Sequence, residues 1–307
     1  MSALGVPQLS SLPSYLSAMS VERYAAFEQA TGVKVARMGE IWWQQSRPFL
    51  YRPLLPFKKY DLTQVRKGFD RVGVFQAAVE DEQPSNSFLN PIIYERPQEY
   101  DAKKFRDSAR KNLNKALRNP IVVRVISDEE QFSEMAYPVY LSFYWRTKYR
   151  FDTSRKDKAK FARWAHAVFQ FPEAVVLGAF VSQELISFEI ACLVENTLIL
   201  KTLVTSDKAL TLNAPDLLLH SYRTIAQDHP KIHRIYDSML SANAGLNNYK
   251  VRRGAQIGAL PAFLHIHPAL RWLIKRANCA AYERLCGSNN EQLSAKGIAR
   301  RMKPEAC

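Results

Sequence analysis

Three apolar runs near the middle of the chain constrain its fold more than any other feature. They read "AVVLGAFV", "ELISFEIACLV" and "NTLILKTLVTS", and they lie at residues 174–181, 184–194 and 196–206. Runs of this length that are rich in Val, Ile and Leu are typical of buried strands. The connections "SQ" and "EN" are short enough to indicate antiparallel neighbours. The sequence therefore predicts a three-stranded antiparallel meander.

The segments around this meander alternate between strand and helix patterns. Residues 121–127, "IVVRVIS", form a β-branched run, and two helical patterns follow it, the first with Pro138 as an expected kink. After the meander, Asn213, Pro215 and Asp216 have the residue types of a helix N-cap and first turn. The predicted order is strand 121–127, helices 129–150 and 156–171, the meander, helix 213–229, strand 232–240, helix 244–254, strand 256–266 and helix 269–285.

The N-terminal third has a different pattern, which is mostly β with at least one helix. Ser20 and Gly32 have the residue types that begin and end a helix. Residues 40–57 carry prolines and aromatic side chains that favour extended or irregular chain. We therefore expect an arm at 1–20, a β-rich region at 21–100, a main domain at 101–286 with its core at 121–268, and a flexible basic tail at 287–307.

The chain carries an excess of positive charge. Its 43 Lys and Arg residues against 29 Asp and Glu residues give a formal charge of +14 and a pI near 9.6. Such an excess favours an anionic partner: nucleic acid, a phosphorylated cofactor or an anionic membrane surface. In the helical pattern at 103–119 Asp107 is the only acid, so the basic face is either a solvated surface or a binding surface. The candidate contacts to nucleic acid or phosphate are Lys103, Lys104, Arg110, Lys111 and Lys115.

Several functional classes leave no signature in the sequence. We expect a cytoplasmic chain without stable membrane insertion, because there is neither a leader with a cleavage site nor an apolar run of the roughly 20 residues that span a bilayer. The four cysteines lack metal-ligand spacing and are expected to be reduced thiols. His265 and His267 have no third ligand close in sequence, so no metal is expected. The P-loop, GxSxG and Rossmann glycine patterns are absent.

The order of elements from Ile121 onward resembles the GNAT acyltransferase fold. Within that superfamily the chain looks closest to the Fem-type aminoacyltransferases and their single-module relatives, which are often encoded near polysaccharide genes. Three local patterns carry the resemblance: "RKNLNKAL" at 110–117, "NAPDLLLHSYRTIA" at 213–226 and "LNNYKVRRGA" at 246–255. The resemblance implies an α/β fold with a mixed, mainly antiparallel central sheet. The N-terminal region is then a candidate for a degenerate second GNAT module.

The resemblance also implies an enzyme that moves an acyl group from acyl-CoA or aminoacyl-tRNA to an amine, in cell-envelope or polysaccharide biosynthesis. In the Fem-type pattern the lysine and glycine of the third motif, here Lys250 and Gly254, lie beside the donor pocket. The segment "DKALTLNAPD" lacks the glycines with which acetyl-CoA enzymes of this fold hold pyrophosphate, which favours aminoacyl-tRNA. Arg252 and Arg253 alternatively serve the C-terminus of a helix. The candidate donor-binding residues are Lys250, Arg252, Arg253, Tyr249 and Asn213.

Acyl transfer in this fold proceeds by direct attack of the amine, so the protein needs a base and no covalent nucleophile. The candidate catalytic residues are Asp237, which matches an acidic residue of the Fem-type pattern, and Glu189 in the second apolar run. Glu189 alternatively pairs with Lys201 on the next strand. The rival hypothesis is a catalytically inactive GNAT-like module that binds RNA or an anionic membrane surface through basic helices at 103–118 and 271–285. No pattern indicates a particular oligomeric state.

Overall fold

A computed structural model describes residues 16–67, 72–147, 153–268, 270–272 and 279–295. The chain divides into two compact units. The first unit comprises the residues up to 31, 94–237 and 252–254, and the second comprises 32–93, 238–251 and the residues from 255 onward. This division differs from the predicted boundaries, because each unit combines segments from both halves of the chain. Most of the predicted arm and more than half of the predicted tail lie outside the described residues.

The central sheet of the first unit confirms the predicted meander. Strands β9 (Ala174–Val181), β10 (Glu184–Val194) and β11 (Thr197–Thr205) are antiparallel neighbours. β8 (Ile121–Val125) lies antiparallel to β9, and β12 (Arg234–Met239) lies parallel to β11, so the order is β12-β11-β10-β9-β8. The short strand β1 (Ala18–Met19) pairs with the end of β10.

The two tight turns of the meander use non-glycine residues in the left-handed conformation. Ser182 has a φ of 56° and Glu195 a φ of 53°. Two-residue hairpin turns of this hand match the right-handed twist of the strands. The turns therefore hold the three strands in register although neither contains a glycine.

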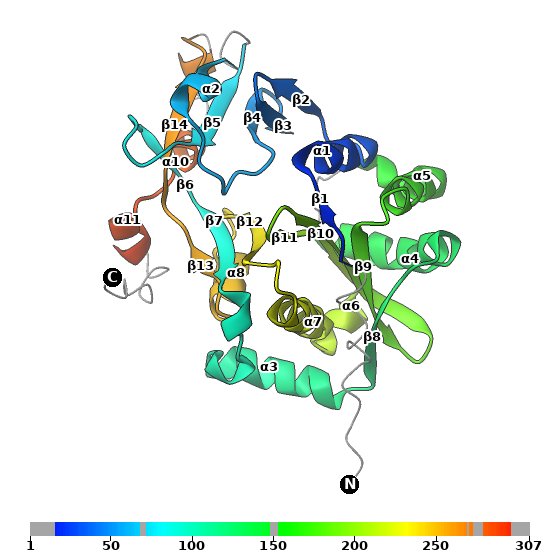
Figure 1. The fold of residues 1–307 in the computed structure, drawn as a ribbon. Coiled ribbons are helices and arrows are strands. Elements are labelled where there is room, and N and C mark those ends of the chain that lie inside the picture. Colours follow the sequence, from blue (N-terminus) through cyan, green and yellow to red (C-terminus); the bar gives the residue numbers. More distant parts are fainter. Residues whose placement is uncertain (1–15, 68–71, 148–152, 269, 273–278, 296–307) are drawn as a thin grey trace. The chain divides into compact units, whose positions relative to one another are not determined.

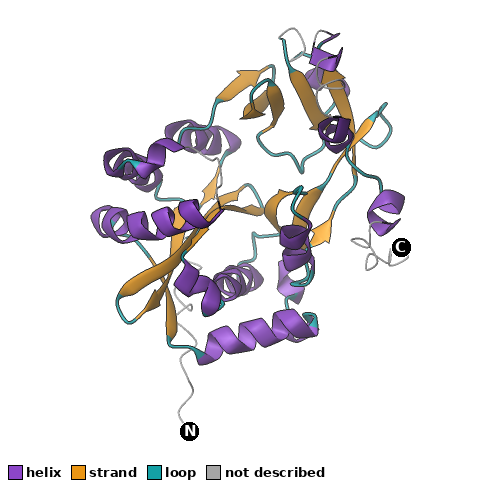
Figure 2. Ribbon diagram, turned by 180° about the vertical axis from the view of Figure 1, so that it is seen from behind, coloured by secondary structure: helices purple, strands orange, loops and turns teal. Residues whose placement is uncertain are grey.

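Helices cover both faces of this sheet (Figure 1). α1 (Val21–Ala30), α4 (Glu129–Thr147) and α5 (Lys158–Phe169) pack on one face, where Phe132 and Trp164 contact Phe188 of β10. α7 (Ala214–Asp228) packs on the other face, with α3 (Asp107–Arg118) against it. Figure 2 shows the same layers from behind. The buried face of α3 consists of Ala109, Leu113 and Ala116, as the helical spacing predicts.

The first unit contains one helix that the sequence predictions lack. α4 continues through Pro138 as a single helix, as predicted, and the kink expected at Pro138 stays a prediction. Residues Asp207–Thr211 form a short helix, α6, that the sequence pattern did not indicate. Its N-cap Ser206 accepts a hydrogen bond from the N–H of Ala209 at 3.2 Å. A helix of one turn carries too few residues to show a periodic pattern.

The second unit is built on another sheet. Its strands are β2 (Val35–Met38), β3 (Ile41–Arg47), β4 (Leu50–Pro53), β5 (Val74–Ala78), β6 (Ser87–Leu89) and β14 (Leu260–Ile266), in the order β2-β3-β4-β5-β14-β6. The helices described in this unit are α2 (Leu62–Arg66), α8 (Ala244–Val251), α10 (Cys279–Cys286) and α11 (Asn290–Ala295). β14 lies between β5 and β6, so the segment predicted to close the main domain belongs to the N-terminal sheet.

Two further features complete the second unit. β7 (Pro91–Glu95) pairs through Ile92 and Ile93 with β13 (Gln256–Ile257). β7 and β12 each carry the chain from one unit into the other. The aromatic segment predicted as extended or irregular forms the β3–β4 hairpin, in which Trp43 is buried edge-on against Phe75 at 5.6 Å between ring centroids.

Candidate active site

Strands β11 and β12 begin side by side and then separate. They pair in parallel over three residues of each strand, Thr197–Ile199 with Arg234–Tyr236, and β11 continues to Thr205 without a further pair recorded to β12. The register between β10 and β11 shifts after Ile190, which leaves Lys201 as an extra residue on β11. Such a bulge bends the strand that carries it. The carboxyl ends of diverging parallel strands are a common position for ligands in open α/β sheets.

Glu189 lies on β10 at the level where these strands have separated. It stands opposite Leu203 of β11, past the last β11–β12 pair, and only 5% of it is exposed. The hydroxyl of Tyr222 on α7 lies 2.8 Å from the carbonyl oxygen of Glu189 and 3.1 Å from that of Val175. Burial, reinforced by the carboxylate of Glu189, raises the pKa of Tyr222 well above its ordinary value. Tyr222 is therefore a neutral donor that fixes the β9 and β10 backbone behind Glu189.

Lys201 forms its recorded ion pair with Glu28 of α1 and not with Glu189. The Nζ–Oε1 distance is 2.5 Å, and the Glu28 side chain is 1% exposed. Cys192 belongs to this cluster, because burial and then the charge of Glu28 raise its pKa. Cys192 and Glu189 are three residues apart on one strand and point to opposite faces of the sheet. The alternative that paired Glu189 with Lys201 is therefore not supported, because Lys201 neutralises a buried carboxylate on the other face.

Asp237 lies at the same end of the sheet as Glu189. It directly follows Tyr236, the last residue of β12 that pairs with β11, and it is partly buried. Its Oδ2 lies 3.5 Å from the hydroxyl of Tyr94, at the outer limit of a hydrogen bond. The structure thus brings both predicted catalytic residues to the carboxyl ends of the diverging strands.

A cavity of about 480 Å³ lies at this end of β11, on the side of α4. Its lining combines an apolar floor with a polar rim. The residues are Met135, Pro138, Val139 and Ser142 of α4, Gln183, Glu184 and Leu185 of the β9–β10 turn, and Ser206, Asp207 and Lys208 at the start of α6.

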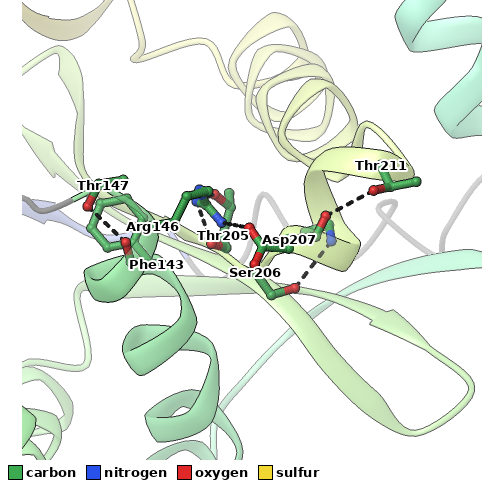
Figure 3. Close-up of polar contacts among 8 residues, drawn as sticks. Phe143, Arg146, Thr147, Thr205, Ser206, Asp207 and Thr211 are labelled. Carbon is green, nitrogen blue, oxygen red and sulfur yellow. Dashed lines mark hydrogen bonds and ion pairs between the residues drawn. The ribbon is translucent and has the colours of Figure 1, made fainter.

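Arg146, near the end of α4, joins α4 to the end of β11 (Figure 3). Its guanidinium donates to the carbonyl and hydroxyl of Thr205 at 2.8 and 2.9 Å, and it pairs with Asp207 at 2.8 Å. Lys208 pairs with Glu184 across the cavity rim. The carboxylates of Asp207 and Glu184 are therefore both paired, and the cavity lies on the α4 face of the sheet, opposite the face to which Glu189 points.

Asp216 and Arg253 form a buried ion pair at the first turn of α7. Nε and Nη2 of Arg253 lie 2.6 and 2.5 Å from Oδ1 of Asp216, and the two residues are 3% and 5% exposed. Burial raises the pKa of Asp216, and the charge of Arg253 opposes that rise. The prediction that Arg253 binds the donor is therefore not supported, because its guanidinium is enclosed and serves Asp216.

Arg223 of α7 holds the chain around Arg253 in place. Its guanidinium lies 4.1 Å from the ring centroid of Tyr100 and 4.6 Å from that of Tyr94, and it donates to the carbonyl of Arg253 at 2.5 Å. The hydroxyl of Tyr100 lies 2.6 Å from Nδ1 of His220, whose pKa is lowered by burial and by the charge of Arg223. Sequence reasoning missed this cluster. The signal for it was a cation on the apolar face of the helix "LLLHSYRTIA".

The remaining residues of the third motif divide between the units. Lys250 and Tyr249 belong to the second unit, where Nζ of Lys250 lies 2.8 Å from Oγ of Ser238. Lys250 is 9% exposed, and Tyr249 is partly buried. Arg252 is exposed in the first unit, and its carbonyl accepts a hydrogen bond from the N–H of Arg106 at 3.3 Å. Gly254 has a φ of 90°, which agrees with the left-handed cap expected there.

The basic helix α3 contacts the junction between α6 and α7. Nζ of Lys115 donates to the carbonyl of Thr211 at 3.2 Å, one residue before Leu212 and two before Asn213. Arg110 pairs with Asp107 at 2.6 Å. Lys111 is exposed on α3, whereas Lys103 and Lys104 are exposed in the 3₁₀ turn Ala102–Lys104 before it. Asn213 itself has a φ of 58° and makes no side-chain cap bond. Three of the predicted cations, Lys103, Lys104 and Lys111, are therefore exposed at the surface of the first unit.

The described part of the chain shows neither a metal-binding cluster nor a membrane-spanning helix. No group of three or more His, Cys, Asp or Glu side chains there lies close enough together to hold a metal ion. Within the same residues, no helix combines the length and the apolar character needed to cross a bilayer.

The strand order, the two helical layers and the separation of β11 from β12 define a GNAT fold of the Fem-like kind. The chain matches no protein-family profile, and no curated protein matches it in sequence. Among solved structures, FemX is similar with a TM-score of 0.56 at 9% identity, over 89% of this chain and 99% of FemX.

Two other solved structures share the fold. L-PGS from Bacillus licheniformis aligns with a TM-score of 0.50 at 11% identity, over 93% of this chain and 98% of L-PGS. A C-terminal domain assigned to a lysylphosphatidylglycerol synthetase from Agrobacterium fabrum aligns with a TM-score of 0.52 at 9% identity, over 82% and 90% of the two chains. The Fem-like GNAT fold that the sequence resemblance implied is therefore confirmed.

Proposed function

We propose that this chain is an acyltransferase that moves an aminoacyl or acyl group from an activated donor to an amine. The observation that carries the proposal is the position of Glu189 and Asp237 at the carboxyl ends of β11 and β12, where these parallel strands separate. The shared fold of FemX and L-PGS supports the same class of reaction by analogy.

The reaction needs positioning and a proton acceptor. The amine nitrogen bonds to the acyl carbon, the bond from that carbon to the donor oxygen or sulfur breaks, and the leaving group departs with a proton. A carboxylate takes the proton that the amine loses, and Asp237 or Glu189 fills that role. Cys192 is not a covalent nucleophile, because it is buried and its pKa is raised, so little thiolate forms.

We infer that the donor is aminoacyl-tRNA. The segment 207–216, which runs from the start of α6 into the first turn of α7, lacks glycine, and its two acids, Asp207 and Asp216, are engaged by Arg146 and Arg253. A pyrophosphate cradle of bare backbone amides therefore has little support there. Lys103, Lys104 and Lys111 at the surface of the same unit suit the phosphates of a polynucleotide.

The cell envelope is the proposed setting of the reaction. The Agrobacterium fabrum neighbour carries the name of a lysylphosphatidylglycerol synthetase. An aminoacyl group of tRNA moved to an envelope precursor or a polysaccharide amine is the corresponding reaction for this chain.

Replacement of the two carboxylates tests the proposal. We expect Asp237→Asn or Glu189→Gln, whichever removes the general base, to lower the transfer rate roughly a hundredfold to ten-thousandfold at unchanged melting temperature. Asp228→Asn removes an exposed carboxylate from the same unit and should leave the rate unchanged. Full transfer activity in both site variants would show that neither carboxylate is the base.

A further inference from the structure

Three chain segments reach the same end of the sheet in the second unit. β4, β5 and β14 are neighbours (Figure 1), and their register places Leu50, Val74 and Ile266 side by side. One residue further out, the N–H of Val74 donates to the carbonyl of Phe49 at 2.7 Å, and the N–H of His267 donates to that of Gly73 at 3.0 Å. The β3–β4 hairpin, the chain before β5 and the chain after β14 therefore all emerge at this end.

Each of these segments exposes one large apolar side chain. Phe49 is 53% exposed, Val72 is 54% exposed and Trp272 is 60% exposed. We call these three residues the apolar tip. The buried cluster at this end of the sheet consists of Val74, Leu264 and Ile266, which pack with Leu50 and Leu270. Large exposed apolar side chains at one end of a sheet mark an interaction surface.

Phe49 adds a second observation. Its φ is 63°, a left-handed value that is rare for a bulky side chain. Backbone strain of this kind persists where the surrounding structure enforces it, and it is common at binding sites. The hairpin turn therefore keeps an aromatic ring at the surface at some cost to local stability.

The surroundings of the apolar tip are basic. Arg47 and Arg271 are exposed in the segments that carry Phe49 and Trp272. No Asp or Glu is present among the described residues 41–60, 259–268 and 270–272. Exposed Trp and Phe beside Arg, with few acids, match the boundary between the headgroups and acyl chains of an anionic bilayer.

We propose that the apolar tip docks the second unit onto an anionic lipid bilayer, with Arg47 and Arg271 at the lipid phosphates. Apolar side chains on three separate segments can each enter a fluid surface, whereas nucleic acid offers no partner for Val72. The proposal goes beyond acyl transfer and does not depend on it, because docking is measured without donor or acceptor.

Vesicle flotation of the full chain tests the docking. We expect binding to vesicles of phosphatidylcholine that contain phosphatidylglycerol, and roughly tenfold weaker binding for the triple variant Phe49→Ser, Val72→Ser, Trp272→Ser. Trp145→Ser is the matched control, because Trp145 is 65% exposed but belongs to the first unit, and it should bind as the unchanged chain does. Arg47→Gln with Arg271→Gln should abolish the preference for anionic over pure phosphatidylcholine vesicles.

Tryptophan emission and melting temperature provide two further measurements. Vesicles should shift the tryptophan emission to shorter wavelength, and Trp272→Phe should remove most of that shift while retaining binding. An unchanged melting temperature of the triple variant excludes unfolding as the cause of lost binding. The proposal is overturned if the triple variant binds as well as the unchanged chain, if Trp145→Ser binds equally poorly, or if the triple substitution abolishes self-association and leaves vesicle binding intact.

Discussion

At the scale of single residues, the buried cluster around Asp216 combines one carboxylate with two guanidinium groups. Asp216, Arg253 and Arg223 lie within one cluster, and each is at most 7% exposed. The sequence identified Asp216 as a helix-start residue and Arg253 as part of a basic motif, but their pairing spans 37 positions and leaves no local signal. Roles that depend on a distant partner are the part of the site that sequence patterns could not predict.

The Asp216–Arg253 pair is expected to contribute more to stability than an exposed pair. Asp216→Asn should lower the free energy of unfolding by about 3 to 5 kcal/mol, because it leaves Arg253 buried without a counter-charge. Asp107→Asn breaks the exposed Asp107–Arg110 pair on α3 and should cost about 1 kcal/mol or less. Urea unfolding of both variants measures the difference. Equal losses would contradict the structural role of the buried pair.

The buried His220 is expected to make stability depend on pH. Its pKa lies below the ordinary 6.5, so below that pH the unfolded chain binds more protons and the folded state loses stability as the pH falls. Between about pH 7.5 and about pH 5.5 the unchanged chain should lose roughly 1 kcal/mol more than His220→Asn, whose amide keeps a polar atom near Nδ1. Urea unfolding of both proteins at both pH values measures this difference. If the free energy of unfolding changes equally with pH in the unchanged chain and in His220→Asn, His220 is not the group responsible.

At the scale of elements, local sequence patterns predicted most helices and strands of the first unit. They could not predict which strands pair when those strands are far apart in sequence. The meander, α5, α7 and the buried stripe of α3 follow from periodicity and residue type. The short helix α6 and the insertion of β14 between β5 and β6 do not, because the first is a single turn and the second pairs residues far apart in sequence. The assignment of the N-terminal region as a degenerate second GNAT module stays a prediction.

The exposed cations of α3 and its preceding turn are expected to bind tRNA. The triple variant Lys103→Gln, Lys104→Gln, Lys111→Gln should weaken tRNA binding and flatten its salt dependence by about two to three ions, since each phosphate contact releases about one counterion. Lys158→Gln, Lys160→Gln, Arg163→Gln removes the same charge from α5 and should have a much smaller effect. Filter binding of tRNA over a salt series distinguishes the two triple variants. If the dependence of tRNA affinity on salt is the same in both, only the net charge of the protein matters and α3 is not a specific contact.

At the scale of the whole molecule, two compact units place different properties in different parts of the chain. The first unit holds Glu189, Asp237 and the basic helix, and the second holds Lys250 and the apolar tip. We therefore expect that a substitution in one unit can abolish acyl transfer or membrane docking without affecting the other. A variant of the apolar tip should keep its rate on soluble substrates, and a variant of Asp237 should keep its affinity for vesicles.

The most direct test of the central claim is a discharge assay with matched donors. Purified chain is incubated with a pool of aminoacyl-tRNA or with acyl-CoA in the presence of amine acceptors, and loss of the acyl group from the donor is followed. We expect discharge of aminoacyl-tRNA that requires an acceptor and is lost in Asp237→Asn or Glu189→Gln. Equal binding of charged and uncharged tRNA, with no discharge of either donor, would contradict it and identify the chain as a binding module.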